Sequence, residues 1–479
     1  MILREQAGAA GLHRDFRIAS EPERIALLGE TLGVSERKAE TLLRAISRAK
    51  RRQRAADDEI EKAIATYTDA LALKNWIDFD DLIGLAVQAL ESDPGVAAHY
   101  RDRFRFVSVD EFQDVDESQY RLLALLAPPG ANLCVIGDPD QAIYGFRGAD
   151  ASCFDRFRAD HPDAKAIRLA RNYRSSGTIV AASSQVIAAG EARPLAAIVR
   201  DLHERIAIHA APTERAEAEF VVQTIEQLIG GHSFFSIDSG RARGGVRSDL
   251  SFSDFAVLYR TNAQSAALME ALARSGIPFK QHSHAPLVEE PGVRALLSAL
   301  EDDAGEAKDL PLPDRLAAAA ERAKRDPARE PTIDATLQRL LALASALPEG
   351  ANFADAVTLA SEADFFDPRA ERVSLLTLHA AKGLEFPVVF IVGLEDGILP
   401  LHWGDPDPVA LAEERRLFYV GMTRAKDRLV LSRALSRRRR GRVQRQEASP
   451  FLNDIVEELV KQQRSEPRRK PEDRQLKLL

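Results

Sequence analysis

The sequence predicts an α/β fold built on parallel sheets that carry helical insertions. Residues 106–109 and 133–136 form two short apolar segments, and acidic residues follow each of them within two positions. Buried strands followed by helices, with polar residues at the carboxyl ends of the strands, are typical of parallel α/β sheets. Such sheets bind ligands at that edge. The carboxyl edge is therefore where we expect a functional site.

The other elements follow in order along the chain. The first hundred residues carry Ala, Leu, Ile and Arg at spacings of three and four, which is typical of helices. Further strands are expected at 256–260, 388–392 and 429–431. Between the first two lies a segment rich in Ala, Leu, Pro and charge, about 289–369, which we expect to be a helical insertion. The tail after Phe451 is expected to be one short helix followed by a polar, Arg/Lys-rich stretch.

Length, composition and charge exclude several classes of protein. With 479 residues, 45% apolar and 29% charged, the chain is neither fully disordered nor collagen-like. The net charge of −8 taken alone argues against a nucleic-acid binder, although Ser436 to Arg442 is locally very basic. Two cysteines, Cys134 and Cys153, do not make a disulfide-rich scaffold. Without a signal-peptide pattern or a long apolar run, we expect a cytoplasmic protein with no membrane partner.

An acidic pair, Asp110-Glu111, follows the first predicted strand. At such a position one carboxylate suits Mg²⁺ and the next can polarise an attacking water. The second strand leads to Gln141, an amide able to sense a phosphate, and then to Tyr144 and Phe146 beside Arg147. Aromatics with arginine are a common arrangement for stacking single-stranded bases. Taken alone, the spacing of the two aromatics at period two favours core residues.

These segments resemble the motifs of the UvrD/Rep/PcrA family of superfamily 1 DNA helicases, and the resemblance extends along most of the chain. Residues 110–114 (DEFQD) resemble the Walker B motif, and residues 137–149 (GDPDQAIYGFRGA) resemble the motif that couples nucleotide to DNA. The remaining matches are RNYRS at 171–175, VLYRTNAQS at 257–265, LTLHAAKGLEF at 376–386 and EERRLFYVGMTRAK at 413–426. The blocks occur in the family's order, which makes a chance match negligible.

The resemblance implies a role for each matched residue in ATP binding and hydrolysis. Asp110 would hold Mg²⁺, Glu111 would orient or deprotonate the attacking water, and Gln141 would read the γ-phosphate. Arg174 and Arg424, from opposite sides of a cleft, would act as arginine fingers on the transferring phosphoryl group, a contribution worth on the order of 10³-fold or more in rate. The nucleotide would also be bound by Tyr173, which would stack on adenine, by Glu385 at the ribose edge, and by Gly383.

The resemblance also implies a track for single-stranded DNA or for junctions with duplex DNA. This track would use Tyr144, Phe146, Arg147, Arg260, Asn262, Thr377 and His379. Where many relatives carry Trp, this chain has Phe146, which keeps a stacking face of smaller area. His379 has no second ligand at metal spacing, so we interpret it as a contact to DNA or between domains.

One motif of the family is missing from the sequence. A phosphate-cradling P-loop needs Gly-x-x-x-x-Gly-Lys-[Ser/Thr], and none of the thirteen lysines follows a glycine. Since Trp76 to Leu82 resembles the segment just before Walker B, we expect the front of the first motor domain to be missing through truncation, frameshift or gene splitting. A separate chain could then supply the P-loop half.

Two functions from different classes remain open at this point. The first is part of an ATP-driven 3′→5′ DNA translocase with roles such as DNA repair, located at the nucleoid. The second is a non-catalytic DNA-binding or regulatory remnant. A nuclease has little support, because no clustered Asp/Glu/Lys pattern is present. Gln475 to Leu479 also resembles a peptide that docks on sliding clamps, with a frayed polar tail as the alternative.

The expected architecture is two RecA-like domains, the first incomplete, each with a helical insertion. The boundaries are 1–100 (first insertion), 101–170 (rest of the first motor domain), 171–288 (second motor domain, first part), 289–370 (shortened second insertion), 371–450 (second motor domain, second part) and 451–479 (tail).

Overall fold

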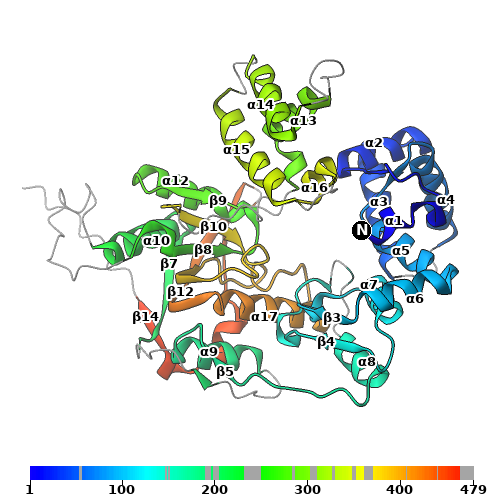
Figure 1. Cartoon of the computed structure of the whole chain (residues 1–479). Coiled ribbons are helices and arrows are strands. Elements are labelled where there is room, and N and C mark those ends of the chain that lie inside the picture. Colours follow the sequence, from blue (N-terminus) through cyan, green and yellow to red (C-terminus); the bar gives the residue numbers. More distant parts are fainter. Residues whose placement is uncertain are drawn as a thin grey trace, which may run out of the picture. The chain divides into compact units, whose positions relative to one another are not determined.

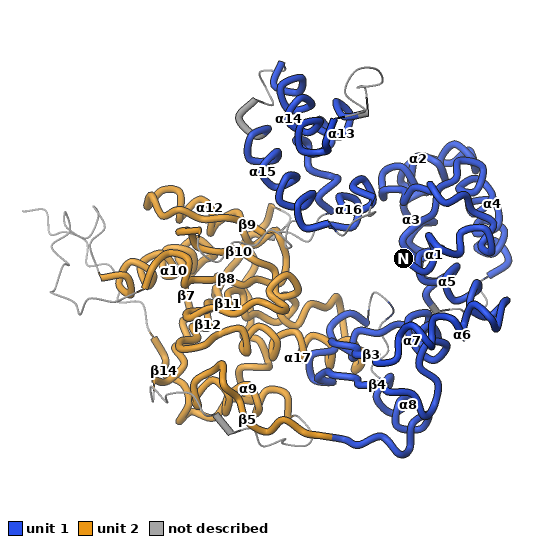
Figure 2. Tube along the Cα trace, in the orientation of Figure 1, with its two compact units in different colours: residues 1–166, 284–366 blue, residues 167–283, 367–479 orange. Residues whose placement is uncertain are grey.

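The computed structural model divides into two compact units (Figures 1 and 2). Unit 1 comprises residues 1–166 and 284–366, and unit 2 comprises residues 167–283 and 367–479. The structure describes residues 1–52, 57–145, 148, 152–188, 196–197, 204–230, 250–282, 286–301, 310–325, 330–347, 352–360, 370–405, 407–439 and 441–463.

Helices dominate the first hundred residues of unit 1. Helix α2 begins with a capping box, in which the Ser20 amide and hydroxyl donate to the Glu23 carboxylate over 2.9 and 2.8 Å. Helices α3 and α4 follow within the same predicted helical region. The helices are α1 (Ile2–Glu5), α2 (Glu21–Leu32), α3 (Glu36–Arg52), α4 (Asp58–Leu73), α5 (Asp81–Ser92) and α6 (Pro94–Arg103), with short strands β1 (Arg17–Ile18) and β2 (Trp76–Ile77) paired in parallel.

The predicted helical insertion is confirmed as helical and has its own apolar core, which includes Leu296, Leu316 and Ile333. Its helices are α13 (Pro291–Glu301), α14 (Leu312–Ala323), α15 (Glu330–Ala346) and α16 (Phe353–Leu359). Asp355 of α16 accepts an ion-paired hydrogen bond from Arg4 of α1. By its contacts this insertion therefore groups with residues 1–166 rather than with the sheet of unit 2 from which the chain enters it.

A two-stranded parallel sheet carries the acidic motif in unit 1. Strand β3 (Phe106–Val109) pairs with β4 (Asn132–Val135), and Val109 lies opposite Val135. The connection runs through α7 (Glu117–Leu126), which starts with a second capping box: the Gln119 amide donates to Asp116 over 2.9 Å. Helix α8 (Cys153–Asp160) follows β4.

Unit 2 is built on one large sheet of eight strands, in the order β14-β7-β12-β11-β8-β10-β9, with β13 paired to β12. Every pairing is parallel except β12 with β13. The strands are β7 (Ile206–Thr213), β8 (Phe255–Tyr259), β9 (Phe279–Gln281), β10 (Val373–Thr377), β11 (Phe386–Ile391), β12 (Ala425–Arg439), β13 (Arg442–Arg445) and β14 (Val460–Gln463); β5 (Arg171–Asn172) and β6 (Ala196–Ala197) form a separate pair.

Fully buried apolar side chains explain why these central strands form. Val257, Leu375 and Phe390 lie in one core with residues of α10 (Glu214–Ile229) and α12 (Ser265–Arg274). The remaining helices of the unit are α9 (Gly177–Ile187) and α17 (Pro408–Met422). The predicted α/β class with parallel sheets is confirmed, and the three strands predicted here correspond to β8, β11 and part of β12.

The segment after residue 450 differs from the single short helix that we expected. It forms two short 3₁₀ helices, Pro450–Asp454 and Glu457–Leu459, and then strand β14. Strand β14 pairs in parallel with β7, so this stretch completes an edge of the sheet. Its polar sequence gave no strand signal because the pairing uses backbone groups. Among the described helices, none has the length and apolar character needed to cross a bilayer.

Candidate functional site

The first set of candidate residues lies at the carboxyl edge of β3 and β4. Asp110 and Glu111 directly follow β3, and both are exposed. The Glu111 amide donates to Asp110 Oδ1 over 2.9 Å, and Glu111 has a left-handed backbone with φ of 51°. Such a conformation costs about 1–3 kcal/mol in a residue other than glycine and is concentrated at functional sites. The strain therefore singles out Glu111 among the acids of this region.

A chain of hydrogen bonds connects Glu111 with Gln141. Gln113 Nε2 donates to Glu111, and Gln113 Oε1 accepts the Asp138 amide over 2.9 Å. The carboxylate of Asp138 in turn accepts a hydrogen bond from Gln141 Nε2 over 2.9 Å. The structure thus brings together two of the predicted residues, Glu111 and Gln141, through Gln113 and Asp138. The one feature of the sequence that could have indicated a role for Gln113 and Asp138 is their position inside the motifs at 110–114 and 137–149.

Close approach of the two strand ends requires glycine at position 137. A Cβ there would stand 2.3 Å from Gln113 Oε1, 3.0 Å from the Phe112 amide nitrogen and 3.0 Å from Phe154 Cζ. Phe112 itself is fully buried and donates its amide to Ile136 O over 2.9 Å. The Gly137 backbone is therefore what lets Gln113 reach both Glu111 and Asp138.

Asp110 fits a magnesium ion that takes most of its ligands from elsewhere. Within the described ranges, no group of three or more His, Cys, Asp or Glu side chains could hold a metal. Mg²⁺ commonly keeps several waters and binds one or two carboxylates together with substrate phosphates. An exposed carboxylate at the end of a strand, as Asp110 provides, meets that requirement.

A second set of candidate residues clusters in unit 2. Arg174 Nε donates to Glu385 over 2.6 Å, and Lys426 Nζ approaches the other oxygen of Glu385 to 2.8 Å. The hydrogen bond from Lys426, followed by that from Arg174, lowers the pKa of Glu385 below its usual value. All three side chains are more than a third exposed. The carboxylate is thus ionised and shared between two cations.

Backbone contacts hold the Arg174 segment against the start of β12. The Ser175 hydroxyl donates to Ala425 O over 2.6 Å, and the Ser176 amide donates to Lys426 O over 2.8 Å. The Asn172 side chain accepts the amides of Arg174 and Ser175, each over 2.9 Å. Arg174 is therefore positioned by a turn that Asn172 stabilises from within and that hydrogen bonds from Ser175 and Ser176 attach to β12.

Arg424 lies beside this cluster but is almost fully buried, with 2% of its surface exposed. Its guanidinium donates to Val420 O over 3.0 Å, to Leu384 O over 3.2 Å and to Thr423 Oγ1 over 3.1 Å. The structure places the residue next to the predicted nucleotide contacts, but its guanidinium engages acceptors of its own unit. An arginine finger needs these donors for phosphate, so a phosphate contact by Arg424 would require them to rearrange.

The two remaining nucleotide candidates are exposed. Tyr173 has 66% of its surface accessible, which leaves its ring available for stacking. Gly383 adopts a left-handed φ of 83° in the turn that precedes Glu385. Nothing lies within 4 Å of a Cβ built on Gly383, so the conformation rather than the space favours glycine there.

The DNA candidates of unit 2 lie at the opposite edge of the same sheet. Arg260 follows the carboxyl end of β8, and Thr377 ends β10, which is its parallel neighbour. Glu385 and Arg424, in contrast, precede the amino ends of β11 and β12. Two groups of predicted residues are thus separated by the length of the strands.

Arg260 is engaged in a bidentate ion pair. Its Nε and Nη2 donate to the carboxylate of Glu414 over 3.0 and 2.7 Å, and both side chains are largely buried. Asn262 is exposed in a 3₁₀ turn, whereas His379 is half-buried. Thr377 Oγ1 accepts the Ala380 amide over 3.2 Å. Of the four residues, Asn262 has the most accessible side chain.

The predicted aromatic track is only partly described. Tyr144 is half-buried in unit 1. Phe146 and Arg147 lie outside the described residues, as does the Gln475–Leu479 peptide. The basic run 436–442 is not uniformly a surface feature, because the Arg437 side chain is buried in ion pairs with Glu217 and Glu395.

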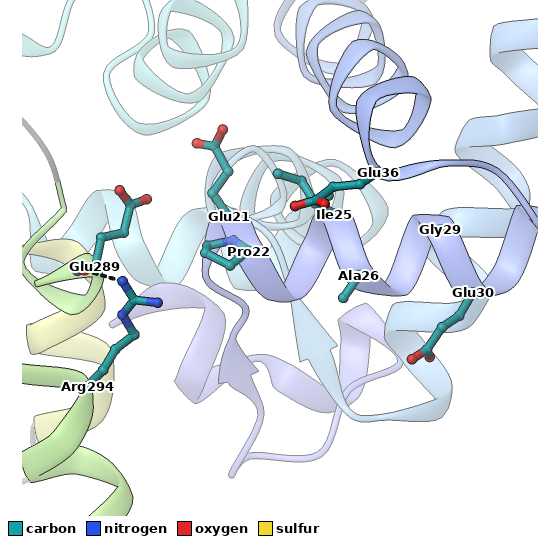
Figure 3. Close-up of a pocket in the computed structure, with 9 residues that line it drawn as sticks. All are labelled: Glu21, Pro22, Ile25, Ala26, Gly29, Glu30, Glu36, Glu289 and Arg294. Carbon is teal, nitrogen blue, oxygen red and sulfur yellow. Dashed lines mark hydrogen bonds between the residues drawn. The ribbon is translucent and has the colours of Figure 1, made fainter. Parts of the chain in front are cut away.

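A groove of about 590 Å³ lies between α2 and α13 and contains none of these residues (Figure 3). Burial and the nearby Glu21 carboxylate raise the pKa of Glu289 at its rim. An acidic lining disfavours DNA phosphates. The lining residues are Glu21, Pro22, Ile25, Ala26, Gly29, Glu30, Glu36, Glu289 and Arg294.

Comparison with known proteins identifies the family. Residues 1–162 match the UvrD/REP helicase N-terminal domain, and residues 167–301 and 326–436 match the UvrD-like helicase C-terminal domain. The ATP-dependent DNA helicase UvrD1 of Mycobacterium tuberculosis is 32% identical over a match that covers 98% of this chain and 75% of that protein. The ATP-dependent DNA helicase PcrA is 30% identical both in Leuconostoc citreum (96% and 73% covered) and in Staphylococcus aureus (98% and 77%). The chain therefore belongs to the UvrD/PcrA-like family of superfamily 1 DNA helicases.

Proposed function

We propose that the chain is part of an ATP-dependent DNA helicase that moves 3′→5′ along single-stranded DNA. Hydrolysis between two RecA-like motor domains would drive the stepping, and DNA repair at the nucleoid is the setting that we favour. The observation that carries the proposal is the hydrogen-bonded connection from the strained Glu111 through Gln113 and Asp138 to Gln141. It links a base for water to an amide suited to phosphate.

In this proposal the residues of unit 1 act on the γ-phosphate and on the attacking water. Asp110 would hold Mg²⁺, which neutralises phosphate charge when it is bound. Glu111 accepts a proton from water, while Gln113 fixes the orientation of its carboxylate. Gln141 donates toward phosphate once its amide leaves Asp138.

The residues of unit 2 would bind the nucleotide and stabilise developing charge. Arg174 is the arginine finger best supported, since it is accessible and rests on a single carboxylate, Glu385. If Glu385 binds the ribose hydroxyls, Lys426 continues to neutralise it when Arg174 moves to phosphate. Tyr173 stacks on adenine, and Gly383 keeps the turn beside Glu385 open. Arg424 would join after its internal hydrogen bonds are exchanged.

Single-stranded DNA would lie along Asn262, Thr377 and His379 at the carboxyl edge of the large sheet, together with Tyr144, Phe146 and Arg147. Base–aromatic stacking is worth roughly 1–3 kcal/mol per base, enough to retain a strand during stepping. Arg260 would support this edge through Glu414, and it would contact phosphate only at the cost of that ion pair.

The phosphate cradle is the part that these 479 residues do not encode, because no lysine follows a glycine. P-loop amides and the loop lysine make the main contacts to the β- and γ-phosphates. We therefore expect weak ATP binding and very little hydrolysis by the 479 residues alone, and we infer that a P-loop segment completes the first motor domain. The same observation favours the second candidate, a DNA-binding remnant without ATPase activity.

DNA-stimulated ATP hydrolysis distinguishes the two functions. For a motor, we expect turnover when the chain is combined with a P-loop segment, and we expect Glu111→Gln to abolish it. A remnant binds single-stranded DNA but gives no turnover in either form. Robust turnover by the 479 residues alone, lost in Glu111→Gln, would contradict both the remnant and the need for a P-loop.

A sliding clamp is a further partner that we propose for the Gln475–Leu479 peptide. Pull-down of a bacterial clamp by the full chain and by a chain lacking these five residues tests it. Equal recovery of the clamp would remove the proposal.

A further inference from the structure

Trp403 is a large apolar side chain of unit 2 that lies in water. Its surface is 80% exposed, although tryptophan is highly buried on average. The only other tryptophan, Trp76 in β2 of unit 1, is half-buried and has the cationic groups of Arg17 and Lys74 over its ring. Tryptophan is enriched among the residues that dominate binding interfaces. The surroundings of Trp403 therefore decide what its ring can bind.

The turn that carries Trp403 is held by the neighbouring His402. One ring nitrogen of His402 lies 2.8 Å from Asp396 Oδ1, and the other lies 2.8 Å from the carbonyl oxygen of Gly404. Gly404 has a left-handed φ of 77°, a conformation that glycine adopts at little cost. The residues on both sides of Trp403 are thus fixed, so less conformational freedom is lost when the ring binds a ligand.

Glu414 of α17 attaches this turn to the carboxyl edge of the large sheet. Its carboxylate accepts the amide of Leu401, two residues before Trp403, over 2.9 Å, and it accepts the guanidinium of Arg260 over 2.7 Å. Arg260 follows the carboxyl end of β8, and the parallel neighbour β11 leads at the same edge into the segment that contains Trp403. Trp403 therefore belongs to the edge along which we expect single-stranded DNA.

The DNA candidates already placed at this edge offer polar groups but no large stacking ring. They are Asn262, Thr377 and His379, whereas the aromatics of the proposed track, Tyr144 and Phe146, belong to unit 1. In the proposed mechanism each motor domain must hold the strand in turn. An aromatic ring on unit 2 would provide such a hold for any sequence, because every base has a π-face.

The charges around Trp403 favour contact with a base rather than with a phosphate. Asp405 and Asp407 follow it in the sequence. Asp407 accepts the Ala410 amide over 3.3 Å at the start of α17, and Asp396 is paired with His402. Carboxylates repel a phosphate group, but the face of a base carries no full charge and is free to stack.

We propose that the exposed ring of Trp403 stacks on a base of single-stranded DNA and is the aromatic contact that unit 2 makes with the strand. A cationic side chain of a protein partner is the competing occupant, because Lys and Arg also bind the face of an indole. This inference rests on the proposed function, since it adds one contact to the proposed DNA edge.

Intrinsic fluorescence makes the proposal measurable in the full chain. In Trp76→Phe, Trp403 is the one remaining tryptophan, so the emission reports its surroundings alone. The probe is an oligothymidylate, added without nucleotide. We expect it to quench the emission of Trp403 and to protect the ring from acrylamide, because a stacked indole is no longer accessible to solvent. Trp76→Phe should bind the oligonucleotide as tightly as the wild type does.

Three variants separate stacking from other effects of a substitution. Trp403→Ala should weaken binding of a labelled oligothymidylate, followed by fluorescence anisotropy, by about 5- to 150-fold, which is the effect of losing one stacked base. Trp403→Phe keeps a ring and should retain most of the affinity. Val409→Ala is the matched control, because Val409 is 71% exposed on α17 and its truncation removes apolar surface but no ring. We expect this control to bind like the wild type, and all three variants to keep the wild-type unfolding midpoint.

Three results would overturn the inference and leave the proposed function standing. The first is an emission of Trp403 that does not change when the oligonucleotide binds, and the second is wild-type affinity in Trp403→Ala. The third is an emission that responds to a lysine-rich peptide or to chain concentration but not to DNA, which would identify a protein partner or a second copy as the occupant. Failure of the wild type to bind the oligonucleotide at all would instead refute the DNA edge of the proposed function, and this inference with it.

Discussion

Arg437 is the residue whose removal we expect to destabilise unit 2 most sharply. It lies on β12 between two acids, with Nε 2.9 Å from Glu395 Oε2 and Nη2 2.7 Å from Glu395 Oε1 and 2.6 Å from Glu217 Oε2. The side chain of Arg437 is 10% exposed, that of Glu395 is 0% exposed and that of Glu217 is 3% exposed. Arg437→Met removes the one cation and leaves two carboxylates in the interior.

The size of the effect follows from burial. The backbone amides of Gly393 and Ala434 donate to Glu217 and Glu395, over 2.9 and 2.7 Å, so neither carboxylate can turn to solvent without breaking another bond. Removing one partner of a buried ion pair costs about 3–5 kcal/mol. If this cost appears in local opening, amide exchange in β11 and β12 should accelerate by about 10²- to 10⁴-fold, since each 1.4 kcal/mol or so is a factor of ten.

Hydrogen–deuterium exchange of the full chain, followed by mass spectrometry of the β11 and β12 peptides, measures that acceleration. Arg438→Met is the matched control, because the neighbouring arginine is exposed on the same strand. We expect this control to exchange at the wild-type rate. Equal exchange in the two variants would refute the assignment of the Glu217–Arg437–Glu395 cluster as a structural centre of the sheet.

Three further substitutions test other parts of the structure. Gly137→Ala should cost about 1–3 kcal/mol in urea unfolding, because its Cβ would stand 2.3 Å from a side-chain oxygen, whereas Gly84→Ala in an open helical position should stabilise by about 0.5–1 kcal/mol. Lys426→Met should cost less than about 1 kcal/mol in the exchange experiment, since its ion pair with Glu385 is more than a third exposed; a cost equal to that of a buried pair would contradict this. Burial first, and then a neighbouring carboxylate, raise the pKa of Asp81 to about 6. Protonation therefore favours the folded state, and the wild type should lose stability relative to Asp81→Asn as pH rises from about 4 to about 6 in urea titrations; parallel pH profiles would refute the raised pKa.

The fold was predictable from sequence wherever apolar strands are fully buried. Val257 and Phe390 belong to continuous apolar runs, and these runs became β8 and β11. Strand β14 was missed because an edge strand such as Val460–Gln463 pairs through its backbone and keeps polar side chains. Long-range contacts were not predictable from the sequence. The Arg4–Asp355 ion pair, for example, joins residues that are 351 positions apart in the chain.

The candidate site was predictable to the level of motifs but not of contacts. The motifs placed Glu111 and Gln141 correctly at one edge of one sheet, but a motif does not reveal that Gln113 and Asp138 connect them. A charge pattern likewise does not reveal burial. Arg437 belongs to the locally basic run 436–442 in the sequence, yet its side chain is paired in the interior.

ATP hydrolysis by the chain combined with the P-loop segment, measured with and without single-stranded DNA, tests the central claim most directly. We predict DNA-stimulated turnover that falls by about 10²-fold or more in Glu111→Gln, because general-base catalysis typically contributes that much. Glu117→Gln, on the nearby helix α7, should leave turnover unchanged. An ATP turnover rate that is the same with and without DNA, or that is unchanged in Glu111→Gln, would contradict the proposal. In either case, the carboxyl edge of the β3–β4 sheet would not be the hydrolysis site of a DNA helicase.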